Sequence, residues 1–430
     1  MNFQSVQAFL SGLVKRHGPL FLAGNGDALE SVKPLLERIM SPSGEVSAMV
    51  TARALLDRYA RFPVEEKLRF FSFLEQHYNA DLDEVRAAYQ RYDESPDSIN
   101  LGRLSRAAES RRHTLIRSLN QTPGATFDLI NMRNDLLGLL PEHPQLQALD
   151  YEFRKAFKSW FGRSFLELRA IDWSTPAIIL ERIIKYEAVH EIQDWDDLKR
   201  RIDPDNRHCF AFFHAALDAE PLIFVQVALG REIPTSIGAI LQSEETEIDV
   251  EDCDTATFYS ISNCQPGLRN VSFGNLLIKQ VARELQAMNP SIKRFVTLSP
   301  MPGLCQWLES ERAEGSELIA GLMEQLEQDD ENGEGGSRRE RALKKLAAMY
   351  LLTARTGKYP WDAVARFHLG NGATIHQLQV DADLSPRGMR QSLGVMVNYL
   401  YDQRHIEHNH EQYLVEGHIH CDSAVQKQLG

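Results

Sequence analysis

Apolar residues recur every three or four positions through six segments in the first part of the chain, which is the spacing of helices with one buried face. Prolines and glycines separate the segments and would end each helix. We therefore predict an all-helical bundle over residues 1–168, with short loops and no pair of groups at catalytic spacing. The predicted helices lie at 46–62, 64–78, 82–92, 102–120, 126–140 and 146–161.

A different pattern begins near residue 169, where strand-like runs alternate with helical ones. This mixture predicts an α+β fold over residues 169–430. The predicted elements are helices within 173–202, strands at 208–214 and 221–229, and a helix at 341–355. Residues 366–402 are predicted to alternate strand-like pieces with glycine turns and to end in a helix.

The stretch from Thr255 to Trp307 organises this second part, because its pattern indicates strand, loop, helix, strand and turn. Its parts are a strand at 256–262, a loop at 265–275, a helix at 276–288, and a strand at 294–298 that prolines at 300 and 302 would stop. A loop carrying Gly274 before a helix N-terminus can bind a pyrophosphate through backbone N–H groups and the helix dipole. An ordinary strand-to-helix turn has the same pattern, and neither GxGxxG nor GK[ST] is present.

Composition argues against some classes of partner and indicates the cellular compartment. The formal net charge of −13 over 430 residues argues against nucleic acid as a partner. Five cysteines at irregular positions, without a CxxC pair, fit a reduced, cytoplasmic protein. We expect no membrane span, because the chain has no apolar run of about eighteen residues, and no secretory leader or transit peptide.

Two residues in the second part could carry proton-transfer chemistry. Ser299 follows an apolar strand and precedes two prolines, which would hold its hydroxyl at a fixed angle. His368 lies in RFHLGNGA, which reads as a strand end before Gly370 and Gly372, where an imidazole could act as acid or base. The plainer interpretations remain open: a serine that starts a turn, and a core histidine bonded to a carbonyl.

Ser260 and Ser262 lie two residues apart in the strand FYSIS, so they should share one face with Ala256 and Phe258, opposite to Tyr259. Their hydroxyls could bond a ligand carbonyl or carboxylate. Serines inside a sheet, without a ligand, are the equally open alternative.

Five histidines and a cysteine gather near the C-terminus. Their spacing, HxxHxH followed by HxHC, matches no closed zinc site, so we predict an exposed polar tail and no metal. They are His405, His408, His410, His418, His420 and Cys421.

The segments FYSIS, LSPMPG and FHLGNGA occur in this order, with YEAVHEIQDWDDLKRRI before them and DLSPRGMRQSLGVMVNYLY after them. Together they resemble the malonyl-CoA decarboxylase family, in a bacterial-type form, over roughly residues 170–403. The resemblance implies a GNAT-like α/β catalytic domain over 169–430 that binds acyl-CoA, after a helical domain over 1–168. Vertebrate members have a glutamate where this chain has Ser272, so a carboxylate role there is not transferable.

The resemblance also implies site residues. Ser299 and His368 are the implied catalytic pair. The implied substrate-binding residues are Ser260, Ser262, Pro300, Gly303 and Asn371. The implied CoA-binding residues are Gly267, Asn270, Val271, Ser272, Phe273, Gly274 and Asn275.

By the same resemblance the chain is expected to be a carboxy-lyase of fatty acid metabolism. It would convert malonyl-CoA to acetyl-CoA and CO2 through an enolate that the His/Ser pair protonates. No cofactor is expected, because the thioester accepts the electron pair, and the helical domain would form a homodimer or homotetramer. Two alternatives remain open: a GNAT-type acyltransferase that moves an acyl group from CoA to an amine, and a CoA-binding regulator without turnover.

Overall fold

The structure, a computed structural model, describes residues 27–41, 44–241, 249–271, 277–327 and 335–430. The chain divides into two compact units. The first unit comprises Met1–Glu167 together with two later segments, Phe213–Glu220 and Gln265–Phe273. The second unit comprises Leu168–Phe212, Pro221–Cys264 and Gly274–Gly430. The domain boundary predicted at 168/169 stays a prediction, and the loop that begins at Gln265 groups with the helical unit.

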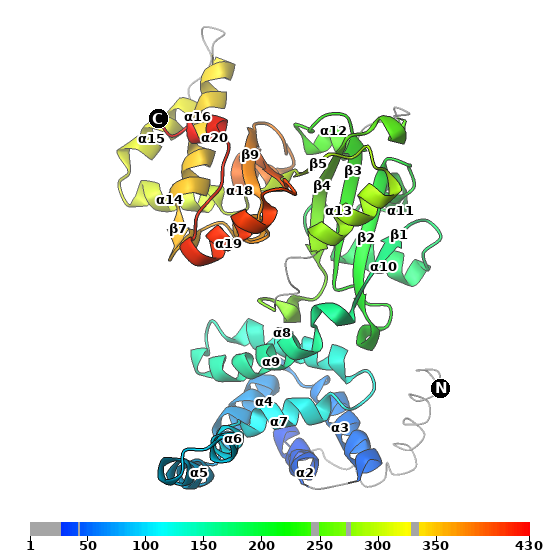
Figure 1. Ribbon diagram of the computed structural model, residues 1–430, viewed down its shortest axis with the longest axis vertical. Coiled ribbons are helices and arrows are strands. Elements are labelled where there is room, and N and C mark those ends of the chain that lie inside the picture. The colour runs from blue at the N-terminus through cyan, green and yellow to red at the C-terminus, as the bar shows by residue number, and fades with distance from the viewer. Residues whose placement is uncertain (1–26, 42–43, 242–248, 272–276, 328–334) are drawn as a thin grey trace. The chain divides into compact units, whose positions relative to one another are not determined.

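The first unit is helical, as its 3.6-residue pattern predicts (Figure 1). Its helices pack around aromatic side chains, with the rings of Tyr59 and Phe70 centred 5.2 Å apart and Phe70 and Phe71 fully buried. The helices are α2 (Ala28–Met40), α3 (Glu45–Tyr59), α4 (Val64–His77), α5 (Leu82–Glu94), α6 (Ser98–Ala107), α7 (Arg111–Leu119), α8 (Ala125–Leu139) and α9 (Gln147–Trp160).

The single helix predicted at 102–120 is wrong, because two helices, α6 and α7, occupy this region. Ser110 separates them: its backbone is extended, and its hydroxyl accepts a hydrogen bond from the Arg112 amide at 3.1 Å. A serine in this position caps the N-terminus of a new helix.

The second unit is built on an eight-stranded sheet of order β1-β2-β3-β4-β5-β10-β6, with β9 paired beside β10. β4 and β5 are parallel and are connected through α13 (Leu277–Met288), whereas β3–β4 and β5–β10 are antiparallel. This mixed sheet confirms the α+β class and agrees with the GNAT-like α/β prediction. The strands are β1 (Leu166–Ile171), β2 (Arg207–His214), β3 (Ile223–Gly230), β4 (Thr255–Asn263), β5 (Arg294–Thr297), β6 (Ser299–Pro300), β9 (Thr374–Gln379) and β10 (Met396–Leu400).

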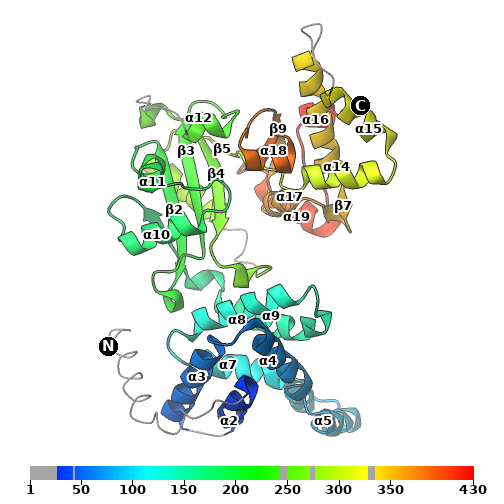
Figure 2. The ribbon, with the colours of Figure 1, turned by 180° about the vertical axis from the view of Figure 1, so that it is seen from behind.

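Helices cover both faces of the sheet. α13 lies over one face, and α10 (Ala177–Tyr186) and α11 (Trp195–Ile202) lie over the other, as the two opposite views show (Figures 1 and 2). The remaining elements of this unit are α12 (Ile237–Leu241), α14 (Leu304–Ala313), α15 (Glu317–Glu327), α16 (Gly335–Thr353), the pair β7 (Arg355–Thr356) and β8 (Tyr359–Pro360), α17 (Ala363–Gly370), α18 (Pro386–Ser392), α19 (Ile406–Glu416) and α20 (Ser423–Gln426). Within the described residues, we find no helix with the length and apolar character of a membrane span.

Two predictions about the strands β10 and β6 are wrong. The segment 366–402 does not end in a helix, because MVNYL forms the strand β10 between β5 and β6. The prolines after residue 298 do not stop the ladder at once, since Ser299 and Pro300 pair with Val397 and Met396 as the short strand β6. Pro300 is tolerated because β6 lies at the sheet edge.

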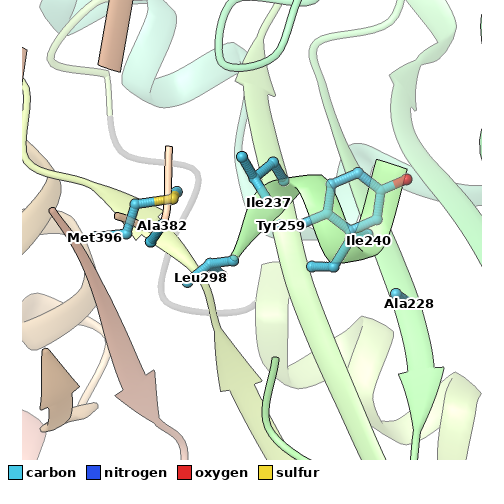
Figure 3. Packing of buried hydrophobic residues seen from close by; sticks show 7 residues of the cluster. All are labelled: Ala228, Ile237, Ile240, Tyr259, Leu298, Ala382 and Met396. Atoms are coloured by element: carbon cyan, nitrogen blue, oxygen red, sulfur yellow. The ribbon is translucent and has the colours of Figure 1, made fainter. Parts of the chain in front are cut away.

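A buried apolar cluster connects β10 to the central sheet at the end of β5. Leu298, which is fully buried, lies between Met396 and Ala382 on one side and Tyr259 and Ile240 on the other (Figure 3). This packing fixes the backbone immediately before Ser299.

Candidate active site

The structure brings Ser299 and His368 together, although 69 positions separate them in the sequence. β4 and β5 pair as far as Phe258 and Thr297, after which the chain leaves β4 and enters β6 with Ser299. Oγ of Ser299 lies 3.0 Å from Nε2 of His368, and both side chains are buried. The two atoms are within the hydrogen-bond distance that acid–base catalysis requires.

His368 lies on the helix α17, not at a strand end, which corrects the sequence prediction. The Asp362 carboxylate starts this helix by accepting a hydrogen bond from the Ala365 amide at 2.7 Å. Tyr350 donates to the other carboxylate oxygen at 2.7 Å, so the cap is itself anchored. The helix carries the imidazole on its last turn, before the predicted turn glycines.

A continuous chain of hydrogen bonds passes through the imidazole. The Tyr401 hydroxyl lies 2.8 Å from Nδ1 of His368, and Ser299 donates to Oγ1 of Thr297 at 2.8 Å. Thr297 also accepts from the backbone amide of Tyr399 at 3.2 Å. With Ser299 donating to Thr297, Nε2 must carry the imidazole hydrogen and Nδ1 must accept from Tyr401.

Burial sets the charge of this site. Desolvation lowers the pKa of His368 from its ordinary value to about 3, because the imidazolium would lose its water. Desolvation also raises the pKa of the Tyr401 phenol well above its ordinary value. The Tyr399 ring stacks on the imidazole, with centroids 4.4 Å apart, and excludes water from that face. At neutral pH the site therefore holds a neutral imidazole between two neutral hydroxyls.

The hydroxyls of Ser260 and Ser262 meet a carboxylate that the sequence analysis missed. Oγ of Ser260 lies 2.8 Å from both carboxylate oxygens of Glu187, and Ser262 donates to Oε1 at 3.1 Å. The amides of Val189 and His190 donate to the same oxygen at 2.8 and 3.0 Å. Each serine has a single hydrogen, and Glu187 accepts it. This geometry gives no support to their prediction as donors to a substrate.

The strand that carries these serines contains a bulge. Phe258 faces Val227 and Ser260 faces the next residue, Gln226, so Tyr259 is an extra residue in β4. The two serines therefore lie on the opposite face from Ala256 and Phe258. The shared face expected from strict alternation is wrong at this point, because the bulge shifts the period by one residue.

Three other predicted substrate-binding residues have structural contacts. Pro300 belongs to β6. A Cβ added to Gly303 would lie 2.4 Å from the Tyr350 hydroxyl, so this glycine permits close packing. Asn371 follows the last turn of α17, and its Nδ2 donates to the Phe367 carbonyl at 2.6 Å. A role of any of the three toward a substrate stays a prediction.

The predicted CoA loop is described as far as Val271. It begins with a short 3₁₀ turn, Pro266–Leu268, and Asn270 has a left-handed backbone with φ of 63°. The other predicted CoA-binding residues, Ser272, Phe273, Gly274 and Asn275, lie outside the described residues.

The C-terminal histidines do not form a tail, although His405, His408 and His418 are exposed as predicted. His408 and His410 lie on α19, and the His420 carbonyl accepts from the Ile375 amide of β9 at 2.9 Å. The rings of His418 and His420 are centred 4.5 Å apart. Across the part of the chain that the structure describes, no group of three or more His, Cys, Asp or Glu side chains is arranged to hold a metal ion.

Sequence reasoning also missed Tyr401 and Thr297. The alternation of polar and β-forming residues in VNYLYD was a signal for the strand β10, which delivers Tyr401 just after its end. Thr297 gave no signal, because a threonine inside an apolar strand is common.

The sequence of this chain is similar to known proteins along most of its length. Residues 164–430 match the family model "Malonyl-CoA decarboxylase C-terminal domain", and residues 78–161 match "Malonyl-CoA decarboxylase N-terminal domain". The chain is 36% identical over 348 residues to "Malonyl-CoA decarboxylase, mitochondrial" of Anser anser anser, which covers 73% of this chain and 68% of that protein.

Solved structures give the same result. A crystal structure of malonyl-CoA decarboxylase from Rhodopseudomonas palustris is similar with a TM-score of 0.88 at 44% identity, covering 93% of this chain and 99% of that one. A second, from Agrobacterium vitis, is similar with a TM-score of 0.87 at 43% identity and the same coverage.

Proposed function

The chain belongs to the malonyl-CoA decarboxylase family, and from this premise we propose that Ser299 and His368 remove CO2 from malonyl-CoA through an enolate. The observation that carries the proposal is the 3.0 Å approach of the Ser299 hydroxyl to Nε2 of His368 in a buried site. A positioned acid–base pair of this kind typically contributes a factor of about 10²–10⁴ to a rate.

The reaction breaks the bond between the α-carbon and the carboxylate carbon. The electron pair of that bond moves onto the thioester, which becomes an enolate, and CO2 leaves. Stabilisation of the developing oxyanion by a fixed hydrogen-bond donor lowers the barrier by about 3 kcal/mol. The thioester is itself the electron sink, so the proposed reaction uses no metal and no organic cofactor.

The enolate is then protonated at the α-carbon. In the proposal the proton comes from His368, directly or through the Ser299 hydroxyl, and water replaces it after product release. Burial holds the pKa of the ligand-free imidazole at about 3, and a bound malonyl carboxylate would raise it again, because a nearby anion favours the imidazolium. Tyr401, which bonds Nδ1, would hold the ring in the productive orientation.

The nucleotide end of the substrate is assigned to the loop 265–275. Backbone N–H groups and the N-terminal end of a helix can bind a pyrophosphate without a cationic side chain. The support for this assignment is the resemblance of the loop to the family, together with the turn at Pro266–Leu268.

The direct test is product analysis with the purified chain and malonyl-CoA alone. We expect acetyl-CoA and CO2 in equal amounts, with undiminished turnover after chelation of metals. Formation of a malonyl amide and free CoA when an amine is added, without release of CO2, would overturn the proposal in favour of acyl transfer. Tight binding of malonyl-CoA without any product would overturn it in favour of a regulator. No observation in the structure favours either alternative.

We also propose that the chain self-associates as a homodimer or homotetramer through the helical unit. The helix α6 buries none of its residues, and its Ile99 and Leu101 side chains are 67% and 51% exposed. On the neighbouring helix α5, Leu82 is 67% exposed and Tyr89 is 55% exposed. Exposed apolar residues on adjacent helices are typical of an interface.

A cytoplasmic location and a role in fatty acid metabolism belong to the same proposal. All five cysteines are free thiols, which fits a reducing compartment. The substrate and the product are both acyl thioesters of CoA.

A further inference from the structure

We propose that Arg133, on the helix α8, is a positioning residue that shapes the loop 265–271 for binding the CoA pyrophosphate. The inference rests on the proposed function, because it takes this loop as the nucleotide-binding part of the site. It gives the helical unit a part in substrate binding, beyond self-association. Arg133 and the segment Gln265–Phe273 belong to the same compact unit.

The Arg133 guanidinium is fully buried and donates hydrogen bonds to the backbone of the loop. Its Nη1 donates to the carbonyl of Gly267 at 2.6 Å and to the carbonyl of Arg269 at 2.8 Å. Its Nε donates to Oδ1 of Asp150, on α9, at 2.8 Å. Its Nη2 has no acceptor among the described residues, so Nε and Nη1 make all of its hydrogen bonds there. Burial of an arginine is costly unless its charge is paired and hydrogen-bonded, so these bonds constrain the loop.

The contact determines where one backbone donor points. In a trans peptide the C=O and the following N–H point in opposite directions, and the described chain contains no cis peptide. Because the Arg269 carbonyl points toward Arg133, the Asn270 N–H points away from α8. Asn270 is exposed, and its N–H has no acceptor within the described ranges. An outward backbone N–H in a turn with a left-handed residue is a donor suited to a phosphate.

A second contact holds the same loop. A Cβ added to Gly267 would lie 2.0 Å from the Ile130 carbonyl oxygen, so the loop backbone lies directly against α8. Only glycine permits this approach. The loop is therefore fixed to one helix at two points, by a hydrogen-bonded cation and by a glycine contact.

The chain offers a matched control for the arginine. Arg154 pairs with the other oxygen of Asp150, with Nε 3.1 Å from Oδ2, and its side chain is 37% exposed. No contact joins Arg154 to the loop among the described residues. Substitution of Arg154 therefore tests the loss of an ion pair with Asp150 without a change to the loop.

The test compares malonyl-CoA with malonyl-pantetheine, which lacks the nucleotide and the pyrophosphate. For Arg133→Met we expect KM for malonyl-CoA to rise about tenfold or more, because one or two hydrogen bonds from the loop N–H groups to the charged pyrophosphate weaken. The kcat should change little. We expect kcat/KM for malonyl-pantetheine to stay at the parental value. Arg133→Lys should lie between, since an ammonium keeps the charge but lacks the planar fork of donors. Arg154→Met should leave both substrates unchanged.

Four results separate the possible failures. Equal losses on both substrates would show that Arg133 is merely structural, and no change on either would show that it does not shape the loop. If the parent turns over both substrates equally well, the loop does not bind the pyrophosphate and the inference falls. If the parent does not decarboxylate malonyl-CoA at all, the proposed function itself is wrong. Should Arg133→Met fail to fold, Gly267→Ala displaces the loop by another contact and must show the same selective rise in KM.

Discussion

At the residue scale, the candidate site is a row of four groups, Tyr401, His368, Ser299 and Thr297, in which each hydrogen bond sets the direction of the next. Only one of the two imidazole nitrogens can carry a hydrogen while the ring is neutral. The hydroxyls at the two ends therefore decide which nitrogen donates. The motifs LSPMPG and FHLGNGA identified the two central residues from the sequence, whereas the two outer ones depend on a strand pairing that no local pattern reveals.

The buried imidazole predicts a pH dependence of stability. Burial lowers the pKa of His368 to about 3 in the folded chain, whereas an unfolded histidine titrates near about 6.5. Below about pH 6.5 the unfolded state binds the proton first, so stability falls as the pH drops toward 3. Between pH 7 and pH 5 the parent should lose about 2 kcal/mol more than His368→Gln does. Urea unfolding of both proteins at the two pH values measures this difference. Parallel losses would contradict the depressed pKa.

The Glu187 cluster predicts that Ser260 acts on stability more than on substrate binding. Ser260→Ala removes a donor to a buried carboxylate and should cost about 1.5–3 kcal/mol. Because its hydrogen is already given to Glu187, KM for malonyl-CoA should change less than about threefold. Denaturant titration measures the free energy of unfolding, and steady-state kinetics on the same preparation measures KM. A large rise in KM at unchanged stability would restore the substrate-binding role that the sequence suggested.

At the element scale, two short elements deliver the pair: β6 presents Ser299 and α17 presents His368. The strands and helices with long periodic patterns were predictable, as β2, β3 and α13 show. The short elements were not, because glycines after His368 suggested a turn, and prolines after Ser299 suggested a stop. Asp362 was the helix signal in the first case, since an aspartate before AVARF is a strong N-cap.

This cap predicts a stability difference between two substitutions. Asp362→Ala removes the acceptor for the Ala365 amide and leaves the buried Tyr350 hydroxyl without its partner. The cost should be about 2–4 kcal/mol, from a lost cap and an unsatisfied buried group. Asp362→Asn keeps one acceptor oxygen and should cost about half as much or less. Chemical unfolding measures both, and equal losses would mean that the cap does not hold α17.

At the scale of the whole molecule, the helical unit contributes more than its repeating pattern indicated. The bundle was predictable from periodicity, but the inclusion of the segment Gln265–Phe273 in the helical unit was not. The hydrogen bond between Arg133 and Gly267 joins positions that are 134 residues apart in the sequence. No local rule anticipates such a pairing. The burial of Arg133 on α8 was not predictable, because an arginine is almost never fully buried unless it is paired.

The exposed helices α5 and α6 predict the effect of charge on self-association. Tyr89→Glu combined with Ile99→Glu places two carboxylates on the proposed interface, where desolvation would oppose assembly. Light scattering after size exclusion should show a dimer or tetramer for the parent and a lower mass for the double variant. Val415→Glu, at a 75% exposed position on α19, is the matched control and should keep the parental mass. A parent that elutes as a clean monomer would refute the interface.

The most direct test of the catalytic pair is the kcat for malonyl-CoA of four proteins: the parent, Ser299→Ala, His368→Ala and the double variant. Each single substitution should lower kcat by a factor of about 10²–10⁴. Because the two groups act as one unit, the double variant should be no slower than the slower single variant within about threefold. The exposed substitutions Ser423→Ala and His405→Ala serve as controls. Single variants that stay folded and keep near-parental kcat, or losses that multiply in the double variant, would contradict the account.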